Sequence, residues 1–340
     1  MTGHAAGMKV LELVAPLQFV VSEKPKPNPQ ADEVLIKVAC CGICGSDVHG
    51  MDNSSGRRIP PMVMGHEASG VIEEVGSEVD GWSEGDRVSF DSMVYCGKCE
   101  HCERGETNLC HERQVMGVSC DEFKRDGAFA EWVVVPARIL ERIPEGLGFE
   151  EAAFTEPLAV ALHAVNLVKV KLGERALVVG SGLIGLLVIQ ALKRAGAGEV
   201  VAVDRDRKRL DLALELGASG AFMPDEDCGD EFDIAMEVVG AAPTLEKAVK
   251  SVRKGGRVGL VGNVVAEVPL ALQWVVTREI SLIGSCAAAG ECSEALEAIA
   301  SGEIQVKPLI SAVASLEEGA DYFKRSREGK EGLLKVLLKP

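Results

Sequence analysis

Four cysteines in the first third of the chain have the spacing of a metal site. They follow the pattern C-x2-C-x2-C-x7-C in a loop-like stretch, at Cys96, Cys99, Cys102 and Cys110. Four thiolates at such spacing bind one zinc ion in a closed tetrahedral shell, which leaves no position for a substrate. The sequence therefore predicts a structural zinc. His101 and His111 lie beside these ligands and could substitute for one, but the four cysteines already complete the shell.

Three further segments contain residues that bind metals or move protons. They are Cys44–His49, with Ser46 and Asp47 inside it, the pair His66-Glu67, and Glu156 before a proline. Each also has a purely structural interpretation. Cys44 could be a small buried hydrophobe, His66 a hydrogen-bonded core histidine, and Glu156 a first-turn helix acid. None of the three segments is diagnostic by itself.

A glycine motif lies between an expected strand at 176–179 and an apolar helical segment that ends near 195. Its glycines are Gly180, Gly182 and Gly185. They permit, in turn, a tight bend, close approach of a pyrophosphate to the backbone, and close packing of helix on strand. The helix opens at Leu183 and Ile184 and directs free N–H groups at the phosphates. Because the next strand ends on Asp204, this context predicts a dinucleotide site rather than a bare strand-turn-helix.

The elements around these residues indicate two kinds of architecture. Residues 8–38 and 69–90 contain short strand-like runs with a proline-rich turn at 25–29, which is typical of a small β-barrel. From Glu156 onward strands and helices alternate, which predicts a doubly wound parallel sheet. Its strands are expected at 176–179, 199–203, 220–222, 233–238, 257–261 and 280–283, and its helices at 183–195, 207–216, 243–252 and roughly 269–276. Two helices, 293–300 and 315–327, and a strand at 333–338 close the chain.

Composition narrows the function classes. A chain of 340 residues is long enough for two domains, and its net charge of −16 argues against nucleic acid or an anionic membrane as partner. No apolar run approaches the roughly 18 residues of a membrane span. The first seven residues are expected to form a loose tail. Eleven cysteines are an odd number for a disulfide framework, and their clustering suits metal ligation in a reducing cytoplasm.

Together these segments resemble the zinc-dependent medium-chain alcohol dehydrogenases, in particular their polyol and sugar-alcohol branch. The resemblance runs from Met8 to Pro340, and it includes the 255–262 glycine segment and the closing 332–337 run. It implies a GroES-like β-barrel catalytic domain, residues 1–157 and 292–340, with a structural zinc lobe at 92–115. A Rossmann dinucleotide-binding domain, residues 158–291, is inserted into it, and the zinc and the nicotinamide are expected to meet between the two.

The family implies a catalytic zinc on Cys44, His66 and Glu67, and Glu156 then supplies a fourth ligand or holds the bound water. Such a zinc is a Lewis acid that lowers the pKa of an alcohol hydroxyl, so that hydride can pass to the nicotinamide. By resemblance, Ser46 takes the proton from the oxygen at the zinc and His49 passes it towards solvent. Asp47 is expected to support the site without taking part in the chemistry.

Cofactor choice depends on Asp204. A carboxylate at this strand end binds the adenosine ribose hydroxyls and repels a 2′-phosphate, so the sequence predicts NAD rather than NADP. The neighbouring Arg205 would favour a phosphate only if the acid were absent, and Arg209 is expected near the same ribose.

The substrate is expected to be a secondary alcohol with neighbouring hydroxyls, oxidised to a ketone. Sorbitol-type enzymes carry a tyrosine after the relay histidine and an Arg-Tyr pair near the domain junction, where this chain has Gly50 and 286–288 instead. Sugar alcohols, their phosphates, inositols, butanediol and threonine therefore stay open. A non-catalytic NAD-binding sensor and a zinc-ribbon interaction module are alternatives from other classes. The family also implies a homodimer or homotetramer. The cysteines outside the two zinc sets are interpreted as packing residues, at 40, 41, 120, 228, 286 and 292.

Overall fold

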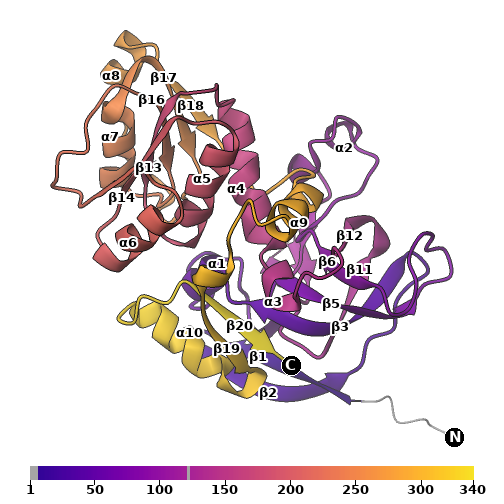
Figure 1. Cartoon of the computed structure of the whole chain (residues 1–340). Helices are drawn as coiled ribbons and strands as arrows, with labels where there is room; N and C mark the ends of the chain where they lie inside the picture. Colours follow the sequence, from indigo (N-terminus) through magenta and orange to yellow (C-terminus); the bar gives the residue numbers. More distant parts are fainter. Residues whose placement is uncertain (1–6, 121–122) are drawn as a thin grey trace, which may run out of the picture. The chain divides into compact units, whose positions relative to one another are not determined.

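The chain divides into two compact units, each with β-sheets of its own. The computed structural model describes residues 7–120 and 123–340 (Figure 1). The first unit contains Met1–Glu156, Cys292–Ser301 and Val306–Pro340, and the second contains Pro157–Glu291 and Gly302–Gln305. The tail expected at residues 1–7 lies outside the described residues, except for Gly7, which begins a strand. The side chain of Cys120 also lies outside them.

The second unit is a six-stranded, wholly parallel sheet of the doubly wound type. Its strands are β13 (Arg175–Val179), β14 (Glu199–Val203), β15 (Gly220–Phe222), β16 (Phe232–Glu237), β17 (Val252–Leu260) and β18 (Ser281–Gly284). Their order in the sheet is β15-β14-β13-β16-β17-β18. The order reverses beside β13, where doubly wound sheets bind dinucleotides. The predicted fold class is confirmed.

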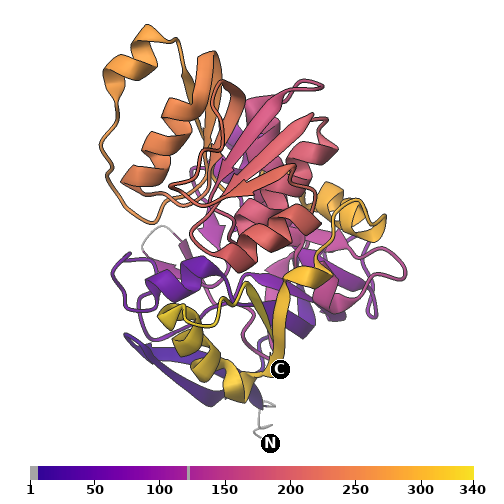
Figure 2. The same ribbon diagram turned by 60° about the vertical axis from the view of Figure 1, so that its left-hand side comes forward.

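Helices cover both faces of this sheet, which explains why its central strands are apolar on both sides. Figures 1 and 2 show α5 (Leu183–Arg194) and α6 (Arg207–Glu215) on one face and α7 (Ala242–Ser251) on the other. Helix α4 (Thr155–Val168) precedes β13. Helix α8 is short, Leu272–Thr277, and begins three residues later than the sequence suggests, because the preceding proline-containing segment does not enter the helix.

The first unit is β-rich, as expected. Its main sheet has the strand order β12-β6-β5-β3-β20-β19, and β11 also pairs with β3. These strands are β3 (Glu33–Gly42), β5 (Glu67–Val75), β6 (Arg87–Phe90), β11 (Trp132–Pro136), β12 (Leu140–Arg142), β19 (Ile310–Ser315) and β20 (Lys335–Lys339). A second sheet joins β1 (Gly7–Ala15), β2 (Gln18–Pro25) and β4 (Met62–Val63). Two short hairpins pair β7 (Met93–Val94) with β8 (Gln114–Val115), and β9 (Val118–Cys120) with β10 (Phe123–Arg125).

Short helices connect these strands. They are α1 (Gly45–Gly50), α2 (Glu100–Glu103), α3 (Phe149–Ala152), α9 (Cys292–Ala300) and α10 (Gly319–Glu328), with 3-10 turns η1 (Thr107–Leu109), η2 (Ala137–Ile139), η3 (Lys307–Leu309) and η4 (Leu316–Glu318). The single helix expected at 315–327 is divided into η4 and α10. Strand β19 was not expected from the sequence, because its exposed face gives it no continuous apolar run.

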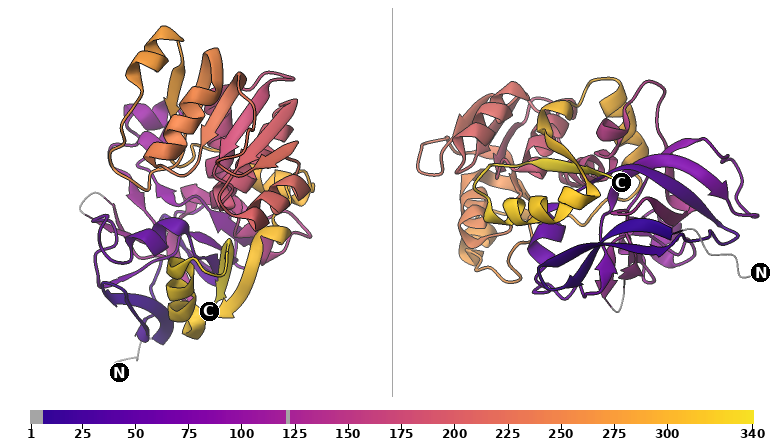
Figure 3. Two further views of the ribbon diagram at one scale, coloured as in Figure 1. Left: turned by 90° about the vertical axis from the view of Figure 1, so that its left-hand side faces the viewer. Right: turned by 90° about the horizontal axis from the view of Figure 1, so that it is seen from below.

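The C-terminal segment returns to the first unit and packs on its N-terminal strands (Figure 3). Strand β20 runs antiparallel to β3, with Leu338 opposite Cys41 and Leu337 opposite Gly42. On α10, Phe323 stacks on Phe19 at 4.3 Å between ring centroids. This return delivers Lys335 to the end of β3 that leads into α1. Among residues 7–120 and 123–340, no helix is both long and apolar enough to cross a bilayer.

Candidate functional site

Cys44 caps a short helix at the end of β3. It stands in extended conformation before α1, and its Sγ accepts a hydrogen bond from the Ser46 backbone N–H at 3.4 Å. The Ser46 hydroxyl also donates to this sulfur, at 3.3 Å. Both contacts fix the position of the sulfur at the start of α1.

The ladder between β3 and β5 brings His66 and Glu67 to Cys44. Glu67 pairs with Gly42, two residues before Cys44, so the start of β5 lies beside the start of α1. One ligand atom from each of Cys44, His66 and Glu67 lies within 4.8 Å of the other two. A thiolate, an imidazole and a carboxylate are all accepted zinc ligands, and three of them leave a coordination position open.

Two buried cations balance the carboxylates around this group. Arg58 donates to Asp47 Oδ1 from Nε at 3.0 Å and from a terminal nitrogen at 2.8 Å, and the two side chains are 5% and 0% exposed. Lys335 donates to Glu67 Oε2 and to the Ile43 carbonyl, the latter at 3.1 Å. These pairs leave one oxygen on each carboxylate without a hydrogen-bond partner among the described residues, Asp47 Oδ2 and Glu67 Oε1.

The residues present fit a divalent cation. Burial disfavours a charged His66, yet the negative charges of Asp47 and Cys44 outweigh burial and raise the His66 pKa to about 10. The same field that stabilises a proton on this imidazole stabilises a metal ion. Asp47 Oδ2 lies 3.6 Å from His66 Nδ1, and neither atom has a hydrogen-bond partner among the described residues. A carboxylate beside one ring nitrogen is the usual means of orienting a metal-ligating histidine, so Asp47 is the candidate for that role.

Glu156 stands at the edge of this group. In the described part of the chain it is not among the residues whose ligand atoms lie within 4.8 Å of one another. Its carboxylate accepts a hydrogen bond from Ser92 Oγ at 3.1 Å. The pKa of Glu156 is raised, mainly by burial, while the charge of His66 lowers it and that of Glu67 raises it. The three ionisable groups therefore interact electrostatically.

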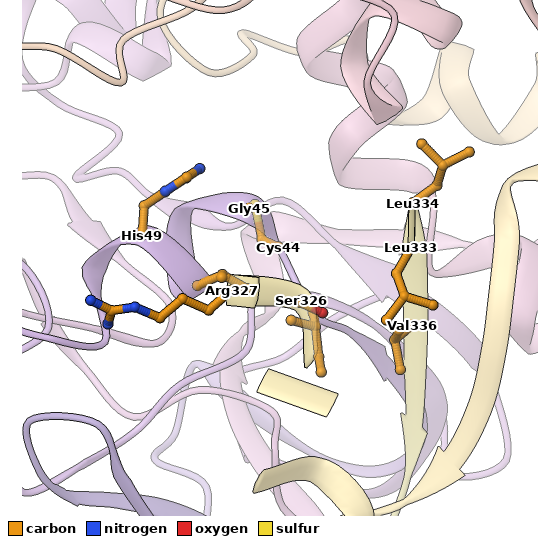
Figure 4. A pocket seen from close by; sticks show the side chains of 10 residues that line it. Cys44, Gly45, His49, Ser326, Arg327, Leu333, Leu334 and Val336 are labelled. Atoms are coloured by element: carbon orange, nitrogen blue, oxygen red, sulfur yellow. The ribbon is translucent and has the colours of Figure 1, made fainter. Parts of the chain in front are cut away.

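Ser46 and His49 occupy the exposed side of α1. They are three residues apart, which places them on one face of the helix. Arg58 donates to the Ser46 hydroxyl at 3.3 Å, so this oxygen accepts from the guanidinium while it donates to Cys44. His49 also lines a cavity of about 150 Å³, whose walls are formed by Ile43, Cys44, Gly45, Val48, His49, Ser326, Arg327, Leu333, Leu334 and Val336. Figure 4 shows these side chains from close by.

The four-cysteine lobe brings its sulfurs together. All four Sγ atoms lie within 4.8 Å of one another. Cys99 and Cys102 are 3.5 Å apart, and Cys96 and Cys102 are 4.0 Å apart. Tetrahedral zinc with a Zn–S distance of about 2.3 Å requires sulfur pairs about 3.8 Å apart, so the spacing fits a closed zinc site. Hydrogen bonds from backbone N–H groups, first that of Cys102 and then that of His111, lower the pKa of Cys99 to about 6.

The glycine turn follows β13 at the point where the strand order reverses. Gly180 has φ +103°, and a Cβ there would lie 2.5 Å from Val239. A Cβ on Gly185 would lie 1.9 Å from the Gly180 carbonyl, so helix and strand pack with no side chain between them. Gly182 faces open space except for the Arg209 guanidinium, 3.8 Å from its ideal Cβ. Leu183 and Ile184 are half-buried, and the rest of α5 is buried up to Leu192.

Asp204 directly follows β14 and accepts hydrogen bonds from the glycine turn and from its own loop. One of its carboxylate oxygens accepts from the Ser181 N–H at 2.6 Å, and the other accepts from the Asp206 N–H at 2.9 Å. Arg205 is exposed, and Arg209 on α6 lies 3.8 Å from Asp206. The buried Nε of Arg209 has no hydrogen-bond partner among the described residues, which suits a group that meets a ligand at the glycine turn.

The remaining cysteines differ from one another. Cys40, Cys41, Cys228 and Cys292 are buried, which agrees with a packing role. Cys41 does not join the metal group, and burial raises its pKa well above the ordinary thiol value. The packing interpretation is wrong for Cys286, which is exposed two residues after the end of the edge strand β18.

Sequence reasoning missed three residues that complete the site, Arg58, Ser92 and Lys335. Arg58 follows a polar loop, and nothing in its spacing relates it to Asp47. Lys335 lies in the closing apolar run, where a lysine between Leu334 and Val336 is the one available signal. A charged residue inside a buried strand needs a partner, and here the partner is Glu67.

Two family models match the chain. That of the alcohol dehydrogenase GroES-like domain matches residues 30–145, and that of the zinc-binding dehydrogenases matches residues 184–301. Among curated proteins, the chain is 34% identical over 337 residues to the sorbitol dehydrogenase of Bacillus subtilis (strain 168), with 95% of this chain and 94% of that protein covered.

Three solved structures share the whole architecture. A protein of Sinorhizobium meliloti 1021 assigned as a zinc-binding dehydrogenase, solved with NADP, is 32% identical with a TM-score of 0.91, covering 98% of this chain and 100% of that one. An alcohol dehydrogenase of Escherichia coli CFT073 in complex with NADH is 30% identical with a TM-score of 0.91 and the same coverage. Galactitol-1-phosphate dehydrogenase of Escherichia coli is 29% identical with a TM-score of 0.89, again covering 98% and 100%. The chain belongs to the zinc-dependent medium-chain dehydrogenase family, in its polyol dehydrogenase branch.

Proposed function

We propose that the protein oxidises a secondary alcohol of the polyol type to a ketone and transfers the hydride to NAD, with release of one proton. The observation that carries this proposal is the group formed by Cys44, His66 and Glu67, which fits zinc with one open position and lies beside exposed proton-transfer residues. We propose that residues 1–157 and 292–340 form the catalytic domain and that residues 158–291 hold the dinucleotide. These bounds differ from those of the two compact units mainly at Gly302–Gln305, which lie in the second unit.

Zinc bound at this group supplies Lewis-acid polarisation of an alcohol hydroxyl. The side chains around the zinc then have to accept the proton of the alcohol hydroxyl and to hold the metal ligands in position. Ser46 relays the proton, because Oγ accepts it from the substrate hydroxyl while its own hydroxyl proton moves on towards His49. Arg58 donates to this oxygen and fixes its position. His49 passes the proton to solvent from the exposed end of α1. Asp47 orients His66, and Glu156 acts as a fourth ligand or holds a water beside the group.

We further propose two zinc ions per chain. The second is held by Cys96, Cys99, Cys102 and Cys110, whose closed shell gives it a structural role. Metal analysis of purified protein tests this, and two zinc ions per chain are expected. The cysteines that the structure describes are free thiols, and thiols that bind metal favour a reducing cytoplasmic location.

NAD is the proposed cofactor because the Asp204 carboxylate follows β14 beside the glycine turn, and a carboxylate at this strand end repels a 2′-phosphate. Relatives bind either form, as the NADP-bound and NADH-bound structures illustrate. Substitution Asp204→Ala should reduce kcat/KM with NAD and raise the relative use of NADP, since the repulsion is removed and Arg205 and Arg209 stay. An unchanged ratio of the two kcat/KM values would exclude Asp204 as the discriminating residue.

The substrate class is tested by a screen of NAD reduction with sugar alcohols, their phosphates, inositols, 2,3-butanediol and threonine. Polyols with vicinal hydroxyls are expected to react. Phosphorylated substrates belong in the screen because Arg327 is a cation on the wall of the cavity beside Cys44, although it also pairs with Asp52 at 3.0 Å. If every alcohol fails while NAD binds, a sensor function replaces the proposal.

The protein is also proposed to form a homodimer through the second unit. Helix α8 exposes large apolar side chains next to the edge strand β18, and Leu272 and Val276 are 62% and 64% exposed. Exposed apolar patches and open sheet edges mark interaction surfaces. Light scattering after size exclusion tests this, because Val276→Lys should yield monomer while the parent chain elutes as an oligomer.

A further inference from the structure

Three polar side chains on the four-cysteine lobe form a second possible ligand set outside its sulfur cluster. They are Glu100 and His101 on α2, and His111 directly after Cys110. Each follows a cysteine of the lobe closely in sequence, so the fold of the lobe holds them in fixed positions. None of them is needed for the closed shell of four sulfurs.

Their geometry is compatible with metal ligation, and Arg104 lies 3.7 Å from Glu100 Oε2. One ligand atom from each of the three residues lies within 4.8 Å of the other two. His111 Nε2 and Glu100 Oε1 are 3.4 Å apart. Two ligands that each lie about 2.0–2.1 Å from a tetrahedral zinc ion are separated by roughly the same 3.4 Å. The two imidazole rings meet edge to face, with centroids 4.9 Å apart and planes at 70°.

A carboxylate outside this group orients one of its imidazoles. Glu106 Oε2 lies 2.8 Å from His101 Nδ1. Glu106 is itself fixed by Arg104, through contacts of 3.1 and 3.0 Å. When Nδ1 donates to a carboxylate, the lone pair of the ring is on Nε2, which is the arrangement seen in most metal-binding histidines. A terminal nitrogen of Arg104 also lies 3.0 Å from Nδ1, so Arg104 competes with this arrangement.

The group is open to solvent. The side chains of His111 and Glu100 are 60% and 66% exposed, and that of His101 is 22% exposed. An ion here would exchange with the medium, and water would complete its shell. Two imidazoles and one carboxylate suit zinc, nickel or cobalt, whereas magnesium and calcium prefer oxygen ligands alone.

We propose that Glu100, His101 and His111 form an exchangeable surface site for a borderline divalent transition metal, separate from the catalytic group and the four-cysteine zinc. The site binds metal without thiolate, and it does not depend on whether the protein turns over any alcohol.

Cobalt distinguishes this site from the cysteine sites, because cobalt on a thiolate absorbs strongly in the near ultraviolet and cobalt on imidazole and carboxylate does not. Purified protein with its resident zinc is dialysed against cobalt chloride in the presence of excess magnesium, and both zinc and cobalt are counted. The sum of zinc and cobalt is expected to rise by one per chain, without a thiolate band.

Variants assign the added metal to these residues. His111→Gln and Glu100→Gln should lose the extra equivalent, and Glu106→Gln should weaken its binding by about 10- to 100-fold. Glu112→Gln is the matched control, because Glu112 is equally exposed on the same lobe and pairs only weakly with Lys98, at 4.0 Å. It should bind cobalt like the parent protein.

Three results would overturn the proposal. The parent protein gains no metal, cobalt binds only with a thiolate band, or a folded His111→Gln protein binds the added cobalt as the parent does. Thermal melts of each variant show whether the lobe is still folded.

Discussion

The four sulfurs of the lobe all come from residues 96–110, whereas the side chains of the Cys44 group come from the start of α1 and the start of β5. The carboxylates of the Cys44 group pair with a buried arginine and with a lysine from the C-terminal strand. The difference teaches that the metal site proposed as structural can be built from one local segment, while the site proposed as catalytic needs distant residues to balance its buried charges.

The largest expected effect separates the two sites by function. Cys44→Ala should lower kcat/KM by about 1,000-fold or more, since a metal's charge stabilisation is worth several kcal/mol. The protein should stay folded, because its sheets do not rest on this thiol. Steady-state kinetics and circular dichroism measure the two properties. Substantial turnover by a folded Cys44→Ala protein that has lost one zinc would contradict a catalytic role for the metal at the Cys44 group.

The lobe should respond in the opposite way. Cys99→Ala should destabilise the protein, because zinc binding contributes on the order of 10 kcal/mol to the folding of small zinc domains. Residual folded enzyme should keep its kcat. Thermal melts and zinc counts, with activity normalised to folded protein, test this. An unchanged melting temperature would remove the structural role of the lobe zinc.

Lys335 tests whether long-range charge balance supports the open site. Lys335→Met leaves the Glu67 carboxylate buried without its partner, and the two side chains are each 1% exposed. A loss of roughly 3–5 kcal/mol in unfolding free energy is expected. Lys339→Met, on the same strand, is the control, because its pair with Glu150 is half-exposed and should contribute about 0–1 kcal/mol.

The pH dependence of this variant follows from the direction of the Lys335 pKa. Burial disfavours the charged lysine, but the negative charges of Glu67, Cys44 and Glu156 together outweigh burial and raise the pKa. A raised lysine pKa contributes stability below the unfolded-state value and loses it only as pH rises through the folded-state value. The stability difference between Lys335→Met and the parent should therefore stay constant around neutral pH and shrink in strong alkali. A difference that vanished near neutrality would contradict the charge pair.

The smallest expected effect concerns the carboxylate behind His66. Asp47→Asn should weaken zinc binding at the Cys44 group by about 10- to 100-fold. The lobe zinc should be unaffected, which makes it an internal control. Competition with a chelator, followed by zinc analysis, measures both affinities in one sample. Equal weakening of both sites would indicate general unfolding instead.

The sequence predicted the local features well and the long-range ones poorly. The lobe cysteines and the glycine turn were recognisable because spacing along the chain determines their geometry. The parallel strands were found within two residues at most ends, except that β17 begins at Val252. Arg58, Ser92 and Lys335 were missed because their partners lie in other elements. The exposure of Cys286 was missed because residue type does not report a position next to a sheet edge.

The proposed two-zinc enzyme is tested most directly by an anomalous difference map at the zinc edge from crystals of the purified protein. Two resident peaks per chain are expected, one between Cys44 Sγ, His66 and Glu67 and one among the four lobe sulfurs. A map with the lobe peak alone, from protein that reduces NAD with an alcohol, would contradict a catalytic zinc on Cys44.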